Sequence, residues 1–124
     1  MKVAYIAGPY RGRNNYEIEC NVRRAEFVSL AVFAAGHAPI CPHSMTRYFQ
    51  GVLVDDAWLT ADFELQSRAD VTLILPEWEA SEGTRMEIEN AGMLKQTVRY
   101  LLPGCCEWHL EDLAEYVGDV LSRV

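Results

Sequence analysis

The hydrophobic and polar positions of this chain alternate between short apolar runs and longer amphipathic segments. Each apolar run stops at a proline, a glycine or a polar loop, which is typical of buried β-strands. Four strands are predicted, over residues 2–7, 37–41, 70–75 and 97–102. The third run, DVTLIL, is apolar almost throughout and therefore favours a strand covered on both faces.

Four helices are predicted between and after these strands, because apolar residues recur there every three or four positions. They span about residues 16–35, 55–69, 83–96 and 107–123. Asn14 or Asn15 is expected to cap the first helix, Gly36 to end it, and Ser81 to open the third. The last helix carries an apolar stripe made of Leu110, Leu113, Val117, Val120 and Leu121.

This regular alternation of strands and helices predicts an α/β fold. We expect a three-layer, doubly wound parallel sheet of four to five strands, flavodoxin-like or Rossmann-like, with right-handed crossovers. At ~150 residues per domain, the 124 residues predict a single domain, residues 1–124. Ligands of such sheets bind beyond the carboxyl ends of the strands. The loops 8–15, 42–55 and 76–83 are therefore expected to build the site.

Composition narrows the classes of partner. The chain has 18 acidic and 11 basic residues, a formal net charge of −7. Nucleic acids and anionic membranes are therefore not expected as partners, although a few local donors can still hold a small anion. No apolar run reaches the ~18 residues of a membrane span, and no signal segment is recognisable. We expect a cytoplasmic protein.

Cysteine and histidine positions predict neither a metal site nor a thiol nucleophile. The four cysteines form no CxxC pair, and the three histidines match no zinc-ligand spacing. We expect reduced thiols, with Cys20 and Cys41 in the core. A catalytic cysteine needs both an electropositive site and a base, and the sequence around each cysteine does not supply both. No cofactor is expected either, because the first loop does not match the GxGxxG dinucleotide fingerprint.

The first loop, GPYRGR, follows the first strand and is the first candidate for ligand binding. Gly8 and Gly12 permit close backbone approach, and the start of the next helix offers free N–H groups to an anion. Arg11 is suited to holding a phosphate or carboxylate. A tight turn with solvated arginines explains the same residues equally well.

Two carboxylates are the candidates for chemistry. Glu87 falls one and a half turns into the helix opened by Ser81, on the face that carries Gly83. Asp62 lies in the helix that leads into the third strand. Two carboxylates that converge on one pocket suit glycosidic chemistry. Taken singly, Glu87 is explained by the helix dipole and Asp62 by a solvated helix surface.

Together these segments resemble the nucleoside 2-deoxyribosyltransferase superfamily, which includes the 2′-deoxynucleoside 5′-phosphate N-hydrolases. The resemblance runs from Val3 to Leu101 and is greatest to short phage and bacterial members. It rests on three features in order: the YIAGP run from Tyr5 to Pro9, the aspartate Asp62 before the third strand, and the SxGxxxE pattern from Ser81 to Glu87.

The resemblance implies a role for each matching residue. Glu87 corresponds to the nucleophile that attacks the anomeric carbon, Asp62 to an aspartate that assists base and sugar, and Tyr5 to a tyrosine that positions the nucleophile. The implied substrate-binding residues are Gly8, Pro9, Arg11, Gly12, Ser81 and Gly83. The superfamily completes its sites with residues of a neighbouring subunit, which implies a homodimer or a larger homo-oligomer.

Three functional hypotheses follow. The first is cleavage or transfer of the N-glycosidic bond of 2′-deoxynucleosides or their 5′-monophosphates. The second is a non-catalytic nucleotide-binding module of the same fold. The third is an interaction protein that uses an exposed Trp78 or Trp108, since an exposed tryptophan often anchors an interface.

Overall fold

A computed structural model describes all residues, 1–124, and contains one four-stranded parallel sheet. The strands are β1 (Val3–Ala7), β2 (Ala38–Ile40), β3 (Val71–Ile74) and β4 (Thr97–Tyr100), and they lie in the order β2-β1-β3-β4. The predicted fold class, a doubly wound α/β sheet, is therefore confirmed with four strands. Residues 4–7 of β1 pair with residues 71–74 of β3, so these two strands form the centre of the sheet.

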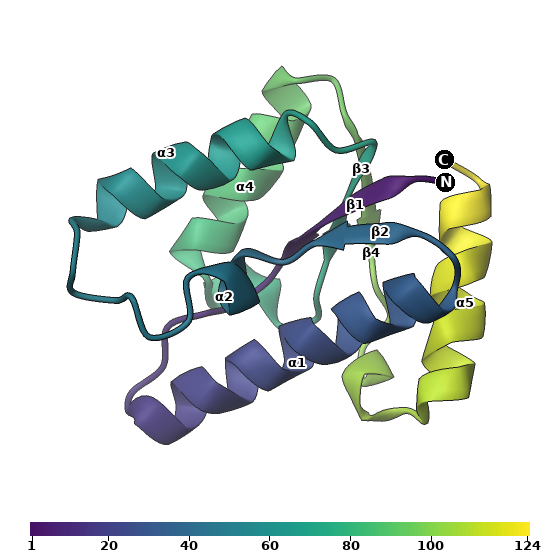
Figure 1. Cartoon of the computed structure of the whole chain (residues 1–124), viewed down its shortest axis with the longest axis horizontal. Helices are drawn as coiled ribbons and strands as arrows, with labels where there is room; N and C mark the ends of the chain where they lie inside the picture. The colour runs from purple at the N-terminus through teal and green to yellow at the C-terminus, as the bar shows by residue number, and fades with distance from the viewer.

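Five helices and two short 3₁₀ turns connect and follow the strands (Figure 1). The helices are α1 (Asn15–Ala34), α2 (Pro42–Met45), α3 (Asp55–Gln66), α4 (Glu82–Met93) and α5 (Leu110–Ser122). The 3₁₀ turns are η1 (Trp78–Ala80) and η2 (Cys105–Glu107). Asn14 and Ser81 cap α1 and α4 with their side chains, accepting hydrogen bonds from Glu17 N and Thr84 N. Both predicted caps are thus confirmed.

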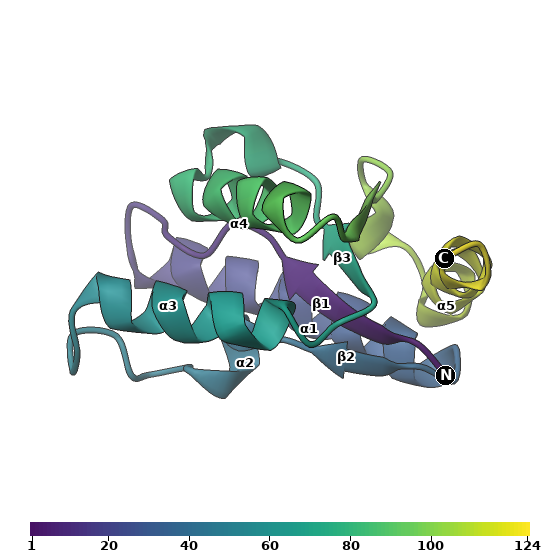
Figure 2. The same ribbon diagram turned by 90° about the horizontal axis from the view of Figure 1, so that it is seen from above.

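The sheet separates two apolar clusters. Alternate residues of a strand point to opposite faces, and Ala4 and Ile6 of β1 pack with α1 and α5, whereas Tyr5 and Ala7 pack on the other side with Ile74. Figure 1 shows α3 and α4 above the strands and α1 below them, and Figure 2 shows α4 and α5 on opposite sides of the sheet. The fold therefore has the three layers that the sequence predicts.

All strands run parallel, but the order in which the chain adds strands across the sheet reverses between β1 and β3. From β1 the chain crosses to β2 at one edge, then returns past β1 to build β3 and β4 on its other side. The loops that leave β1 and β3 diverge at such a switch point and leave a crevice for a ligand. These are the loops after Ala7 and after Ile74, two of the three loops expected to build the site.

The structure corrects four boundaries. Residues 42–45, expected as loop, form α2, because Pro42 occupies the first helical turn, where its missing N–H costs nothing. The helix predicted to run to residue 69 ends at Gln66. The helix α4 ends at Met93 instead of residue 96, since Lys95 adopts a left-handed conformation with φ 56°. Residues 105–107 are a 3₁₀ turn, so the last helix starts at Leu110 instead of residue 107.

None of the helices combines the length and the apolar character needed to span a membrane. The apolar stripe predicted for the last helix is confirmed, because Leu113, Val117 and Leu121 of α5 are buried in the cluster that it shares with α1. Cys41 is buried as predicted, but Cys20 is only half-buried on α1, and all four cysteines are free.

Candidate functional site

A cavity of about 720 Å³ opens at the carboxyl ends of β1 and β3. Its volume falls within the ~300–1,000 Å³ typical of small-molecule sites. The lining comes from the loops after β1 and β3, from α2 and the segment that follows it, and from α3 and α4. All three loops that the sequence assigns to the site contribute to it.

Glu87 is a largely buried residue of the cavity lining. It is 8% exposed, on the second turn of α4, with Thr84 and Ala91 buried on the same face. The Tyr5 hydroxyl, from the centre of β1, donates a short hydrogen bond to Glu87 Oε2. Tyr5 is fully buried and does not itself line the cavity. The side chain of Glu87 is therefore held from below, which leaves Oε1 as the oxygen without a hydrogen-bond partner.

Burial raises the pKa of Glu87 to about 7. The Tyr5 hydrogen bond and the charge of His43 act in the opposite direction, while the negative charge of Asp62 raises the pKa further. Tyr5 stays protonated, because burial and the carboxylates of Glu87 and Asp62 raise its pKa well above the ordinary value. Tyr5 is thus a fixed hydrogen-bond donor to the carboxyl group that titrates near neutral pH.

Asp62 reaches the same cavity from α3. Its burial raises its pKa to about 6, against a smaller lowering effect of His43. The structure therefore brings together the two carboxylates that the sequence singles out. Asp62 is half-buried at the cavity and does not lie on a freely solvated helix surface. Two carboxyl groups that titrate close to each other and to neutral pH are typical of sites that transfer protons.

His43 is a cavity residue that the sequence analysis did not identify. It is 6% exposed on α2, and its Nε2–H donates to the carbonyl oxygens of Gly8 and Pro9 at 3.1 and 3.0 Å. The first loop is thus fastened to α2 through its backbone. Pro42 at the start of a helix directly after a predicted strand was the only sequence signal for this position.

Cys41 lies beside His43, so one cysteine of the chain has a base next to it. Burial raises the pKa of the Cys41 thiol, but the polar groups of His43 and Ser29 outweigh it and the pKa is lowered. The pKa of His43 is raised, since Cys41 and the Pro9 carbonyl outweigh the effect of its burial. His43 lines the cavity but Cys41 does not, so the Cys41 thiol supports the position of His43 and does not face the cavity itself.

The structure places all but one of the implied substrate-binding residues at the cavity. Gly8, Pro9, Arg11, Ser81 and Gly83 line the cavity, whereas Gly12 does not. A Cβ on Gly12 would stand 2.5 Å from the Cβ of Glu17, so this glycine serves the close approach of the loop to α1. The first turn of α1 is engaged by its own neighbours, because Glu17 N donates to Asn14 and the Glu17 carboxylate pairs with Arg13.

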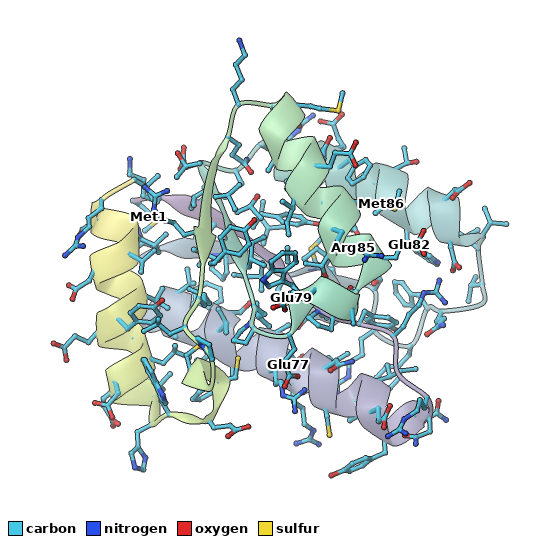
Figure 3. All side chains as sticks on the ribbon, turned by 180° about the vertical axis from the view of Figure 1, so that it is seen from behind. Met1, Glu77, Glu79, Glu82, Arg85 and Met86 are labelled. Atoms are coloured by element: carbon cyan, nitrogen blue, oxygen red, sulfur yellow. The ribbon has the colours of Figure 1, made fainter.

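Carboxylates dominate the charge of the cavity. Arg11 is its one arginine, and no lysine lines it. The guanidinium of Arg11 forms an ion pair with Asp55, and both side chains are about two-thirds exposed. Six acidic residues line the cavity, namely Asp55, Asp56, Asp62, Glu77, Glu82 and Glu87. Figure 3 labels Glu77 and Glu79 on the segment that joins β3 to α4, and Glu82 at the start of α4.

Apolar side chains also contribute to the cavity lining. Trp58 and Leu59 come from α3 and Met86 from α4. Trp78 and Trp108, considered as exposed contact residues, are only partly exposed and pack against Tyr100 and Tyr116 at 5.3 and 5.4 Å between ring centroids. No group of three or more His, Cys, Asp or Glu side chains is placed to hold a metal ion.

Comparison with known proteins identifies a family. Residues 2–101 match a family described as a domain of unknown function, DUF7768. No curated protein matches the sequence. The matched segment runs from β1 to β4 and contains every residue of the cavity, while α5 lies outside it.

Proposed function

The chain belongs to the DUF7768 family, and we propose that it cleaves or transfers the N-glycosidic bond of 2′-deoxynucleosides with Glu87 as the nucleophile. The observation that carries the proposal is the buried Glu87 carboxyl group, held by Tyr5 and facing a cavity that also contains Asp62. The resemblance of the SxGxxxE and YIAGP segments to the deoxyribosyltransferase superfamily supports the same chemistry.

The proposed reaction begins at Glu87. Its Oε1 attacks the anomeric carbon of the deoxyribose while Tyr5 holds Oε2. The bond between the anomeric carbon and the base nitrogen breaks, and its electron pair goes to the base. Without a 2′-hydroxyl the deoxyribosyl cation forms readily, so one carboxylate and a proton for the leaving base are sufficient. Water or a second base then takes the sugar and releases the Glu87 carboxylate.

Asp62 supplies the proton in this scheme. With its pKa raised to about 6, it is able to hold a proton near neutral pH and to give it to the leaving base. Trp58, Leu59 and Met86 offer apolar surface against which a base ring can lie. The carboxylate that attacks and the carboxyl group that protonates thus come from two helices that flank one cavity.

We further propose that the substrate is the nucleoside and not its 5′-monophosphate. A phosphate group would enter a cavity with six acidic side chains and one arginine that is already paired with Asp55. Like charges in a confined site disfavour binding, whereas an uncharged nucleoside meets no such repulsion.

The test is release of free base from a panel of deoxynucleosides and their monophosphates. Glu87→Ala is expected to abolish release, and Tyr5→Phe to reduce it by about 10-fold or more, as expected when one hydrogen bond to a reacting group is lost. Glu89→Ala, which removes an exposed acid from the same helix, is the matched control. If no panel member loses or exchanges its base but one raises the melting temperature, the non-catalytic binding module replaces this proposal.

We also propose that the chain acts in the cytoplasm and as a homo-oligomer. The end of α2 and the segment after it carry several exposed apolar side chains close to the cavity, as a surface covered by a second copy would. These are Met45, Tyr48, Phe49, Val52, Leu53 and Val54. Light scattering on the purified protein tests this proposal, with Leu53→Asp expected to shift the mass to that of the monomer.

A further inference from the structure

Gln66 is a fully buried polar side chain that the proposed chemistry does not use. It ends α3 and has no exposed surface. Its Nε2 donates to Thr72 Oγ1 at 3.0 Å and to the carbonyl oxygen of Glu87 at 2.8 Å. Its Oε1 accepts from Asn90 Nδ2 at 2.9 Å. A buried amide without partners would cost ~1–3 kcal/mol, so this complete set of partners fixes Gln66 in one position.

The neighbouring groups determine which end of the Gln66 amide is which. Gln96 Nε2 donates to the carbonyl oxygens of Gln66 and Ala69, so Gln96 Oε1 must accept from the Thr72 hydroxyl. Thr72 Oγ1 has its proton engaged there and can only accept from Gln66 Nε2. The Gln66 amide therefore has only one orientation that satisfies all of these hydrogen bonds, with Oε1 directed toward Asn90 Nδ2.

Gln66 consequently forms hydrogen bonds with α4 at two positions about one turn apart. Its Nε2 bonds the backbone of Glu87, and its Oε1 bonds the side chain of Asn90. A single contact would allow α4 to rotate about it, whereas two contacts three residues apart fix both the rotation and the position of the helix. The Gln66 side chain also donates a hydrogen bond to Thr72 on β3, so it connects both helices to the sheet.

Asp62 lies on α3 and Glu87 on α4, the two helices that the hydrogen bonds of Gln66 connect. Asp62 precedes Gln66 by four residues, so both side chains project from the same face of α3. The backbone carbonyl oxygen that accepts the hydrogen bond of Gln66 Nε2 belongs to Glu87 itself. We propose that Gln66 is a positioning residue that sets the separation of the Asp62 and Glu87 carboxyl groups. Its role in the reaction rests on the proposed function, but the separation itself does not.

The pKa of Glu87 reports this separation, because the charge of Asp62 raises it. The titratable groups that face Glu87 are Tyr5 from β1, His43 from α2 and Asp62 from α3. Only Asp62 sits on the helix that Gln66 ends. If α3 separates from α4, water is expected to enter between them and the repulsion between the Asp62 and Glu87 carboxylates is expected to decrease. Both changes lower the pKa of Glu87.

The experiment is a carbon-13 NMR titration of the Glu87 carboxyl group in the full chain. In Gln66→Met, which keeps the length of the side chain but not its hydrogen bonds, the pKa of Glu87 is expected to fall from about 7 toward that of an ordinary glutamate. Asp62→Asn should lower the Glu87 pKa in the wild type and much less in the Gln66→Met background. Leu113→Ala, a cavity in the opposite cluster, is the control for lost stability and should leave the Glu87 pKa at about 7.

A Glu87 pKa that stays at about 7 in folded Gln66→Met, or that falls equally in Leu113→Ala, overturns the proposal. If Gln66→Met does not fold, Asn90→Ala, which removes one of the two contacts with α4, is expected to give a smaller fall in the same direction, and its absence overturns the proposal too. No substrate enters this measurement. If the protein releases no base but the Glu87 pKa falls in Gln66→Met, only the proposed function is refuted. If it releases base but the Glu87 pKa does not fall, only the positioning role of Gln66 is refuted.

Discussion

Replacing Glu87 by glutamine is expected to stabilise the folded protein above neutral pH while it abolishes base release. Glutamine keeps the size of the side chain and a carbonyl oxygen that can accept the Tyr5 hydroxyl, but it cannot ionise. The wild-type carboxyl group must ionise in a site where its pKa is raised from 4.5 to about 7. At ~1.36 kcal/mol for each pH unit, that difference corresponds to about 3 kcal/mol of folding free energy.

The sign of the effect follows from proton binding. A carboxyl group with a raised pKa holds its proton more tightly in the folded state, so its contribution to stability is complete below pH 4.5 and is lost as the pH rises through about 7. The wild type should therefore weaken over this range, and Glu87→Gln should not. At pH 4 the two proteins should unfold with similar free energies. At pH 8 the variant should be more stable by about 3 kcal/mol, or roughly 10 °C in melting temperature for a chain of this length.

Urea unfolding at pH 4, 6 and 8 measures the difference. The matched control is Glu89→Gln, which removes an exposed charge from the same helix and should change stability by less than about 0.5 kcal/mol at each pH. A variant that is less stable than the wild type at pH 8, or that gains as much at pH 4 as at pH 8, would refute the assignment of a buried, reluctantly ionised carboxylate.

Three further outcomes are expected. Base release should peak between pH 6 and 7, because the Asp62–Glu87 pair most often carries a single proton there, and the reactive form has that proton on Asp62 and the charge on Glu87. A kcat/KM that stays flat from pH 5 to 8 would contradict this. Asp55→Asn, which frees Arg11 and removes a charge, should improve the affinity for 5′-monophosphates relative to nucleosides in isothermal titration. An unchanged ratio would mean that the cavity charge does not select the substrate. His43→Ala, which leaves two carbonyl oxygens of the first loop without their donor, should cost at least about 2 kcal/mol in urea unfolding, and a smaller loss would mean that the loop does not depend on it.

The fold was predictable because its signals are local. Apolar runs end at glycine or proline, helices repeat every three or four residues, and Asn14 and Ser81 carry cap signals that the structure uses. The boundaries that were missed depend on competing local geometry. Lys95 ends α4 in a left-handed conformation that its residue type does not announce, and Pro42 begins a helix too short to show a repeat.

The candidate site was predictable only in part, because its contacts join distant parts of the chain. Tyr5 and Glu87 are separated by 82 positions, and only the resemblance to a family linked them before the structure did. His43 and Gln66 gave no such signal. A glutamine in an amphipathic helix normally lies on the surface, and Gln66 is buried because Thr72, Asn90 and the backbone of α4 complete its hydrogen bonds.

The placement of α5 has a practical consequence. This helix packs on α1, on the far side of the sheet, and none of its residues lines the cavity. Glu111, Glu115 and Asp119 form an exposed stripe along its outer surface. A chemical tether attached to this stripe would hold the molecule on a sensor surface with the mouth of the cavity turned toward the solution, so that weak ligands can be screened on immobilised protein without blocking their entry.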